Sequence, residues 1–390
     1  MNFNYYIPTK ILFGPGKLNE LAGEDLPGKR ALIVISSGNS MKKLGYLKRL
    51  EDILEGKGIG YVVFDKILPN PIKAHVMEGA ELAKDEKCDF VIGLGGGSSI
   101  DSAKIIALMA KNPGDYWDYV IGGSGKAMPF KNGVLPVVAI TTTAGTGTET
   151  DPFAVITNEE TSEKIGLKCV FPALSVVDPE LMLSVPARLT AFQGFDALLH
   201  AVEGYIANAA TPISDIYALK SIELISRNLP LCVKDGADLE ARTQVALANT
   251  LSGFVESTSR CTSEHSMEHA LSAYHHELPH GAGLIMLSEA YHKFFAAKVP
   301  GRFTDMARAM GVDVDSLTEQ ERPMSFVKAL VKLQEDCNVR GLKMSDYNIG
   351  KEEIPALAEH ARKTMAALFN MDPYALSLEE TIEIMNKAYR

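Results

Sequence analysis

The chain has 390 residues, a formal net charge of −10 and five scattered cysteines, and these values exclude several classes of protein. Its length exceeds what one hydrophobic core usually supports, so it predicts two domains. The acidic balance leaves no general basic surface for nucleic acid or for a membrane, and we expect neither as a partner. No two cysteines form a C-x-x-C pair, and neither a leader pattern nor a run of 18 apolar residues occurs, so we expect a cytoplasmic protein.

The first half of the chain has the pattern of strands that alternate with helices. Such alternation indicates βαβ units and a parallel sheet, whose buried strands are continuous apolar runs. A short strand at residues 5–13 is expected to precede them as the edge of a hairpin. The other predicted strands are 31–35, 61–64, 90–94 and 137–141, and the predicted helices are 42–57, 72–86 and 99–111.

After Pro186 the pattern changes to apolar residues at three- and four-residue spacing, with no comparable strand runs. We therefore predict an α/β domain over residues 1–185 and an all-helical domain over residues 186–390. Two prolines around a short apolar stretch mark the boundary at 178–186. The predicted helices of the second half include 215–228, 239–255, 266–274, 324–337 and 354–369.

Three consecutive glycines follow the predicted strand at 90–94, in the stretch VIGLGGGSSIDSAK at 91–104. Glycines let a backbone approach an anion closely, and a helix N-terminus directs free N–H groups toward it. The turn therefore predicts phosphate binding, with Asp101 in the first helical turn as a further candidate cofactor contact. A strand-to-helix turn capped by Ser99 would show the same residues.

A second polar run, TTTAGTGTET at 141–150, follows the next strand. Its hydroxyl and N–H groups suit a polar ligand, and an exposed turn explains the run equally well. Ligands of open α/β sheets bind at the carboxyl ends of the strands, so two such loops on neighbouring strands reinforce the prediction of a ligand site.

The turn after the first predicted strand of the βα units reads SSGNSMKK at 36–43 and contains no acidic residue. In dinucleotide sites an acidic residue at this place binds the adenosine ribose and repels a 2′-phosphate. If Ser37, Asn39 and Ser40 meet the ribose, the turn favours NADP(H) over NAD(H). A helix start capped by Ser40 is the alternative.

Five of the nine histidines lie between 265 and 280. Further upstream, Asp196 and His200 are four residues apart on an apolar helical pattern, so both face one side of a helix. A hydrogen-bonded Asp–His pair would explain these two residues alone, but the later histidines favour a metal site. A carboxylate with imidazoles suits Fe²⁺ or Zn²⁺, which acts as a Lewis acid on an oxygen. The later residues are His265, His269, His275, His276 and His280, of which the adjacent pair is expected in a surface loop.

These motifs together resemble the iron-containing (group III) alcohol dehydrogenase family over essentially the full length. The matching segments are GGGSSIDSAK at 95–104, TTTAGTGTE at 141–149, GFDALLHAVEGY at 194–205 and the HSMEH…LPHG block at 265–281. The resemblance implies a dehydroquinate synthase-like fold. Its N-terminal domain would be Rossmann-like and bind a dinucleotide, and its C-terminal domain would bind the metal and the substrate.

The resemblance also implies roles for single residues. The histidine at 269 would relay a proton or orient the substrate. The metal ligands would be Asp196, His200, His265 and His280. The cofactor contacts would be Gly96, Gly97 and Ser98 at the pyrophosphate, Thr142, Thr143 and Thr146 along the cofactor, Asn70 at the adenosine ribose and Lys164 at the nicotinamide ribose.

We therefore expect a metal-dependent, NAD(P)(H)-linked alcohol dehydrogenase or aldehyde reductase that acts on small primary alcohols and aldehydes. The expected metal is Fe²⁺, with Zn²⁺ possible, and a homodimer or larger homo-oligomer is expected. The alternatives are a polyol or hydroxyacid dehydrogenase, a dehydroquinate synthase-like lyase, and a non-catalytic nucleotide-binding protein. The last of these would need no metal ligands.

Overall fold

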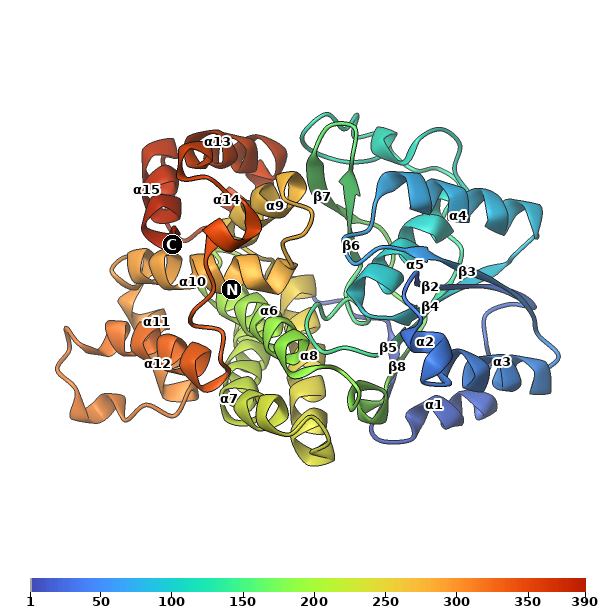
Figure 1. Ribbon diagram of the computed structural model, residues 1–390, viewed down its shortest axis with the longest axis horizontal. Helices are drawn as coiled ribbons and strands as arrows, with labels where there is room; N and C mark the ends of the chain where they lie inside the picture. Colours follow the sequence, from blue (N-terminus) through green and yellow to red (C-terminus); the bar gives the residue numbers. More distant parts are fainter. Residues whose placement is uncertain (1) are drawn as a thin grey trace. The chain divides into compact units, whose positions relative to one another are not determined.

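The computed structural model describes residues 2–390, which form two compact units (Figure 1). The α/β unit comprises residues 7–143 and 148–183. The helical unit comprises residues 2–6, 144–147 and 184–390. The division near 183 lies beside the predicted boundary, but the two short segments that group with the helical unit have no counterpart in the sequence prediction.

A six-stranded parallel sheet forms the centre of the α/β unit, in the order β1-β8-β5-β4-β2-β3. This confirms the predicted parallel sheet, because the four predicted central strands are neighbours in it. The side chains of β2, β4 and β5 are almost all buried, as continuous apolar runs predict, whereas those of the edge strand β3 are mostly half-buried. The strands are β1 (Lys10–Phe13), β2 (Arg30–Ser36), β3 (Gly60–Ile67), β4 (Phe90–Gly95), β5 (Val137–Thr141) and β8 (Leu174–Val177).

The N-terminal strand differs from its prediction. It begins at Lys10 rather than at residue 5, and it is no hairpin, because β1 pairs in parallel with β8 from Lys10 opposite Leu174 onward. Residues 2–6 belong to the helical unit, where the Tyr5 hydroxyl lies 3.0 Å from that of Tyr217. The four-residue strand β8 is too short to give a periodic signal, so the sequence did not indicate a partner for β1.

The helices of the α/β unit lie in the predicted segments, except that one predicted helix is divided into two. The predicted helix at 42–57 is two helices, because Gly45 has a φ of 75°, which no regular helix accommodates. The helices are α1 (Lys17–Glu20), α2 (Ser40–Lys43), α3 (Tyr46–Gly56), α4 (Lys73–Asp85) and α5 (Gly97–Met109).

An antiparallel hairpin of β6 (Phe153–Asn158) and β7 (Glu163–Lys168), which was not predicted, is attached to α5 by a buried lysine. The Lys104 ammonium is fully buried and donates to Thr148 Oγ1 (2.7 Å), Asp151 Oδ1 (3.1 Å) and the Phe153 carbonyl (2.6 Å). Buried charges persist only when paired and hydrogen-bonded, so this lysine fixes the start of the hairpin.

The second half is helical, as predicted, and no strand occurs among residues 184–390. The predicted helix at 354–369 is interrupted at Met365, whose φ of −127° is not helical. No helix among residues 2–390 combines the length and the apolar character needed to cross a membrane. The helices are α6 (Ala187–Ile206), α7 (Pro212–Lys234), α8 (Leu239–Thr258), α9 (Ser263–Tyr274), α10 (His280–Ala296), α11 (Pro300–Ala309), α12 (Arg322–Asp336), α13 (Ile354–Thr364), α14 (Ala366–Phe369) and α15 (Leu378–Ala388).

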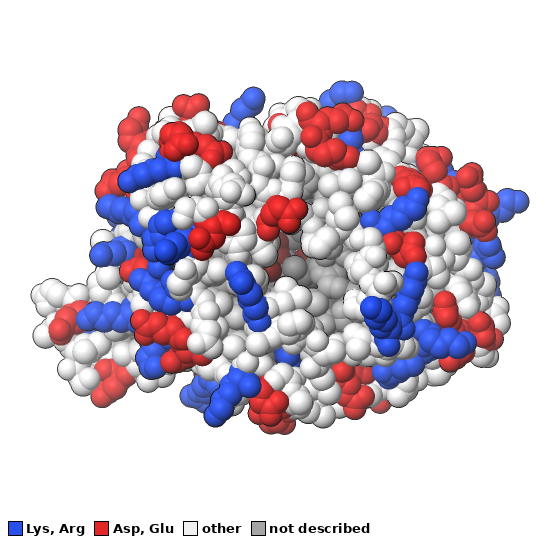
Figure 2. All heavy atoms as spheres, viewed as in Figure 1, with Lys and Arg blue, Asp and Glu red and all other residues white. Residues whose placement is uncertain are grey.

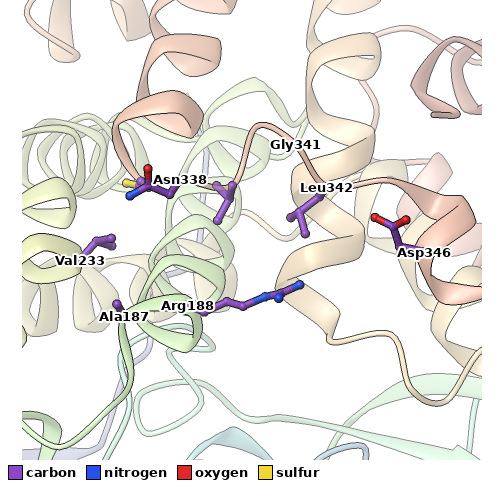
Figure 3. A pocket seen from close by; sticks show the side chains of 9 residues that line it. Ala187, Arg188, Val233, Asn338, Gly341, Leu342 and Asp346 are labelled. Atoms are coloured by element: carbon purple, nitrogen blue, oxygen red, sulfur yellow. The ribbon is translucent and has the colours of Figure 1, made fainter.

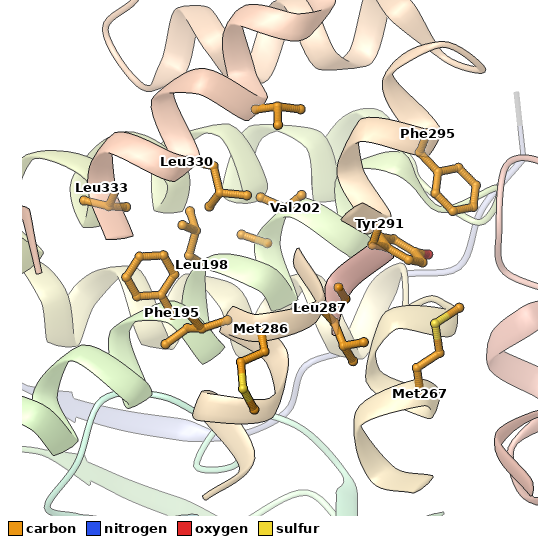
Figure 4. Packing of buried hydrophobic residues seen from close by; sticks show 14 of the residues in the cluster. Phe195, Leu198, Val202, Met267, Met286, Leu287, Tyr291, Phe295, Leu330 and Leu333 are labelled. Carbon is orange, nitrogen blue, oxygen red and sulfur yellow. The ribbon is translucent and has the colours of Figure 1, made fainter. Parts of the chain in front are cut away.

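The core of the helical unit is built around α6 and α10. Figure 4 shows Phe195 and Leu198 of α6 beside Met286 of α10 and Leu330 of α12, all buried. On the surface, Figure 2 shows basic and acidic side chains interspersed over the face in view. The buried core makes α6 a rigid support for the side chains on its remaining face.

We predict that Lys104→Met lowers the free energy of unfolding of the α/β unit by about 3–5 kcal/mol, because the Asp151 carboxylate then stays buried without this cation. Urea unfolding followed by the fluorescence of Trp117, the single tryptophan, measures it, because Trp117 lies in the α/β unit. The control is the exposed Lys111→Met, expected within about 0.5 kcal/mol of the wild type. Equal stability of the two variants would contradict the prediction.

Candidate functional site

A buried aspartate and histidine on α6 begin a cluster of possible metal ligands in the helical unit. Asp196 and His200 lie on one face of the helix and are 4% and 6% exposed. Their neighbours Phe195 and Leu198 pack in the core, so the position of this face is fixed by apolar contacts. The packing of α6 therefore restrains the backbone positions of both Asp196 and His200.

Two more histidines reach Asp196 from α9 and α10. His265 lies in the first turn of α9, and His280 is the first residue of α10. The glycine after His280 is needed here, because a Cβ on Gly281 would collide with the Phe192 carbonyl of α6. The close approach of α10 to α6 brings the His280 ring to Asp196.

The atoms of this cluster have the spacing of a cation site. Asp196 Oδ1 lies 3.6 Å from His200 Nδ1, 3.5 Å from His265 Nε2 and 3.3 Å from His280 Nε2. Ligands at about 2.1 Å around a tetrahedral ion lie about 3.4 Å apart, so these distances fit. Asp196 Oδ1, His200 Nδ1 and His265 Nε2 are buried without a hydrogen-bond partner among the described residues, which a bound cation would correct.

The electrostatics of Asp196 and His200 favour an ionised carboxylate beside a neutral imidazole. Burial opposes ionisation of Asp196, but the neighbouring His200 and His280 hold the pKa of its carboxyl well below the usual value. Burial lowers the pKa of His200 to about 4, so this ring is neutral near pH 7. A carboxylate and a neutral imidazole are the forms that bind Fe²⁺ or Zn²⁺.

Two further side chains that can bind a metal, those of His269 and Cys261, lie near the four predicted ligands. His269 lies one helical turn after His265, its ring centre 5.4 Å from that of His280 and its Nδ1 2.9 Å from Met365 Sδ. Cys261, which the sequence did not single out, has its Sγ within 4.8 Å of nitrogens of His200 and His265. Burial raises the pKa of this thiol, so without a metal it remains protonated.

The remaining histidines of the block at 265–280 lie apart from Asp196 and its partners. His275 follows α9, and its Nε2 lies 3.1 Å from Glu353 Oε2. His276 is exposed in the turn between α9 and α10.

In the α/β unit the glycine-rich turn leaves a helix start free of side-chain caps. Helix α5 begins at Gly97 with Gly96 as N-cap, so the alternative of a turn capped by Ser99 is wrong. Gly95 has a φ of 148°, and a Cβ on Gly96 would lie 3.1 Å from the Thr143 side chain. The free N–H groups of α5 and the space that glycine leaves above them suit a phosphate.

The threonine run lies beside this turn, as expected for loops on neighbouring strands. Gly95 pairs with Thr141 in the sheet, and the Thr142 N–H donates to the Gly95 carbonyl (2.9 Å). Thr142 and Thr143 therefore lie at the same sheet edge as Gly96. Thr146 belongs to the helical unit.

The glycines of the threonine run serve packing within the helical unit. A Cβ on Gly147 would lie 2.6 Å from Gly253 Cα of α8, and one on Gly145 would lie 3.0 Å from Gln193 Cα of α6. The Gly147 N–H also donates to Asn249 Oδ1 (2.9 Å). The sequence pattern could not distinguish this packing role from an anion-binding one.

The other cofactor candidates occupy several places in the α/β unit. Ser98 donates its hydroxyl to the Pro69 carbonyl, which brings the start of α5 beside Asn70. Lys164 is a buried residue of β7. Asp101 accepts hydrogen bonds from Thr148 Oγ1 (2.6 Å) and from the Val155 N–H (2.9 Å), so its carboxylate is turned toward the hairpin.

The turn predicted to meet the ribose connects β2 to α2. Asn39 is the N-cap of α2 and makes no side-chain cap, so the alternative of a helix capped by Ser40 is wrong. The Ser37 N–H donates to the Ile67 carbonyl of β3 (2.8 Å). The neighbouring strand also brings Asp65, whose carboxylate pairs with Lys42. The sequence missed this acidic residue because it lies on another strand.

A separate pocket of about 410 Å³ lies in the helical unit, at the first turn of α6 and the segment after α12 (Figure 3). Its lining includes Arg188, Asn338 and Asp346 but none of the candidate ligands. We assign it no part in the chemistry above.

A cluster with the spacing of a cation site in one unit and an uncapped, glycine-rich helix start in the other are typical of one class of protein, the metal-dependent dehydrogenases that use a dinucleotide. Comparison with known families agrees. The model of the iron-containing alcohol dehydrogenases matches residues 8–179, and that of the C-terminal domain of the Fe-containing alcohol dehydrogenase family matches residues 190–389. The chain belongs to the iron-containing alcohol dehydrogenase family, and it is an alcohol dehydrogenase.

Individual relatives span the whole chain. Alcohol dehydrogenase 4 of Saccharomyces cerevisiae is 36% identical over 99% of this chain and 98% of its own length. The NAD-dependent methanol dehydrogenase of Bacillus methanolicus is 32% identical over 99% of both chains. The crystal structure of a mutant of an archaeal halo-thermophilic Red Sea brine pool alcohol dehydrogenase superposes with a TM-score of 0.93, at 33% identity, over 100% of this chain and 99% of that one.

We predict a pH-dependent contribution to stability from Asp372, which anchors the start of α9. Its Oδ1 accepts from the Ser263 N–H and from the Tyr291 hydroxyl (both 3.0 Å), while Oδ2 is buried without a partner among the described residues. Burial raises the pKa of this carboxyl to about 7. The folded chain therefore holds a proton that the unfolded chain releases near pH 4, and this stabilisation is lost as the pH rises through 7.

The stability difference between the wild type and Asp372→Asn should fall by about 3 kcal/mol between pH 5 and pH 8.5, because the carboxyl deprotonates only in the wild type. Urea unfolding followed by far-UV circular dichroism at both pH values measures this difference. A difference that is constant with pH would show that Asp372 is ionised in the folded chain.

Proposed function

We propose that this alcohol dehydrogenase acts on small primary alcohols and their aldehydes, with Fe²⁺ held by Asp196, His200, His265 and His280. The observation that carries the proposal is the arrangement of three histidine rings around the orphaned Asp196 Oδ1. We also propose a cytoplasmic homo-oligomer. Zn²⁺ fits the same donors, so metal availability decides between the two ions.

The helical unit supplies rigidity and charge at the reaction centre. When bound, the metal supplies Lewis-acid polarisation of the substrate oxygen. Asp196 contributes the negative charge that retains a divalent ion, and the buried surroundings exclude water from its ligands. His269, which lies beside His280, holds or moves a proton at its imidazole or orients the substrate.

The α/β unit supplies the cofactor site. A bound nicotinamide dinucleotide supplies the hydride chemistry. The N–H groups of Gly97 and Ser98 at the start of α5 bind its pyrophosphate, while Thr142 and Thr143 contact its polar groups. Asn70 and Lys164 are proposed at the two riboses. For Asp101 we propose a supporting role, because its carboxylate already binds Thr148 and β6.

We predict that Asp196→Ala and His200→Ala lose bound metal and activity together. The value of kcat/KM should fall at least about 10³-fold, because several kcal/mol of transition-state stabilisation depend on the metal. Metal content by mass spectrometry and aldehyde reduction measure the two losses. The control His275→Ala, which pairs with Glu353, should keep both.

The prediction fails if His200→Ala keeps normal activity after treatment with a chelator. Net oxidation of the cofactor by simple aldehydes also separates a dehydrogenase from a lyase on the same fold, because a lyase would use the nicotinamide only transiently. Polyols and hydroxyacids tested beside C2–C6 aldehydes separate the other dehydrogenase alternatives.

We further propose that the chain prefers NADP(H) to NAD(H), although the related methanol dehydrogenase is NAD-dependent by name. The support is the turn from Ser37 through Asn39 and Ser40, which carries no carboxylate and is followed by two lysines. The pair of Lys42 with Asp65 opposes the preference, because it partly neutralises one of these lysines.

We therefore predict that Asp65→Asn raises the ratio of kcat/KM for NADPH to that for NADH by about 2- to 5-fold, a gain of 0.5–1 kcal/mol typical of an exposed charge. Steady-state kinetics with both cofactors measure it. The matched control is Asp52→Asn, which breaks another exposed Lys–Asp pair, with Lys48, and should leave the ratio unchanged. A wild-type preference for NADH would contradict the proposal.

A further inference from the structure

Three glutamates of the helical unit, each completely buried, contact a histidine ring nitrogen. Two of these histidines are proposed metal ligands, and the third packs against Phe303 and Phe326 in the helical core. None of the glutamates is among the residues that the sequence singled out. The pairs are Glu203 with His265, Glu268 with His280, and Glu264 with His292.

Glu203 of α6 holds His265 through the ring nitrogen that faces away from Asp196. One carboxylate oxygen contacts His265 Nδ1. The other accepts from both the N–H and the hydroxyl of Thr262 (2.7 Å each). With both oxygens bound, the carboxylate cannot rotate, and the His265 ring is fixed with Nε2 toward Asp196 Oδ1.

Glu268 of α9 holds His280 in the same manner. Its Oε2 contacts His280 Nδ1, while His280 Nε2 lies 3.3 Å from Asp196 Oδ1. The space for this carboxylate comes from Gly283 of α10, where a Cβ would lie 2.7 Å from Glu268 Cγ. A glycine one turn after the first residue of α10 therefore allows the contact.

We propose that Glu203 and Glu268 are positioning residues of the metal centre, a role that depends on the metal site proposed above. A neutral imidazole that donates its Nδ1–H to a carboxylate has a bare Nε2, so each glutamate sets the tautomer that presents an electron pair to the ion. Each also fixes the orientation of the ring before the metal arrives. The carboxylate makes the ring a stronger donor.

The third pair provides a matched control. Glu264 Oε2 lies 3.0 Å from His292 Nε2, both side chains are completely buried, and the two atoms form no hydrogen bond. His292 packs against Phe303 and Phe326 in the helical core and is no ligand. Replacing Glu264 therefore removes a buried carboxylate on the same helix as Glu268 that lies beside a histidine outside the proposed ligand set.

The experiment compares the affinity of apo-protein for Zn²⁺ among the variants, in competition with a chromophoric chelator. Glu203→Gln and Glu268→Gln should each weaken binding by about 10- to 100-fold, the usual loss for such supporting carboxylates. Glu264→Gln should stay within about 2-fold of the wild type. Thermal melting of the apo-proteins by circular dichroism separates a folding defect from a binding defect.

The proposal is overturned if Glu203→Gln and Glu268→Gln bind Zn²⁺ as tightly as the wild type, or if Glu264→Gln weakens binding as much as they do. If Glu203→Gln does not fold, Thr262→Val tests the same contact and should weaken binding about 3-fold through one lost hydrogen bond. A wild type that binds no Zn²⁺, or binds it equally after Asp196→Ala, would refute the metal centre itself and not the role of the glutamates.

Discussion

The buried carboxylate of Asp196 is the constraint on which the helical unit depends. A charge held in a protein interior is costly unless opposite charge or hydrogen bonds surround it. Here ring nitrogens from three helices lie around Asp196 Oδ1, at distances too long for good hydrogen bonds and suited to ligands of one ion. The packing of α6, α9 and α10 therefore creates the site at which we propose a divalent cation.

The need to position Asp196 and the three histidines explains several residues that take no part in the reaction. Gly281 allows α10 to meet the backbone of α6, and Phe195 and Leu198 anchor the face of α6 opposite the ligands. Glu203 and Glu268 orient two of the rings from behind. A metal centre of this kind is built as much by its apolar and second-layer contacts as by the ligands themselves.

The α/β unit faces an electrostatic difficulty of another kind. It must bind a cofactor that carries several negative charges, although the protein itself is acidic. The net charge of −10 gives no general attraction for phosphates. The uncapped start of α5 supplies oriented N–H groups instead, and the glycines at 95 and 96 leave the space above them. Local backbone geometry can thus favour a phosphate while the protein as a whole repels it.

The sequence by itself determined the parallel sheet, the helical second half and the residues of the two motifs, because apolar periodicity and the spacing of Asp196 and His200 are local properties of the chain. Local signals failed where a partner lay far away in sequence. The parallel pairing of β1 with β8, the hairpin held by Lys104, the approach of Asp65 to Lys42 and the buried Glu–His pairs were decided by tertiary structure. Each depends on which side chains meet when distant segments pack, and a linear pattern does not record that proximity.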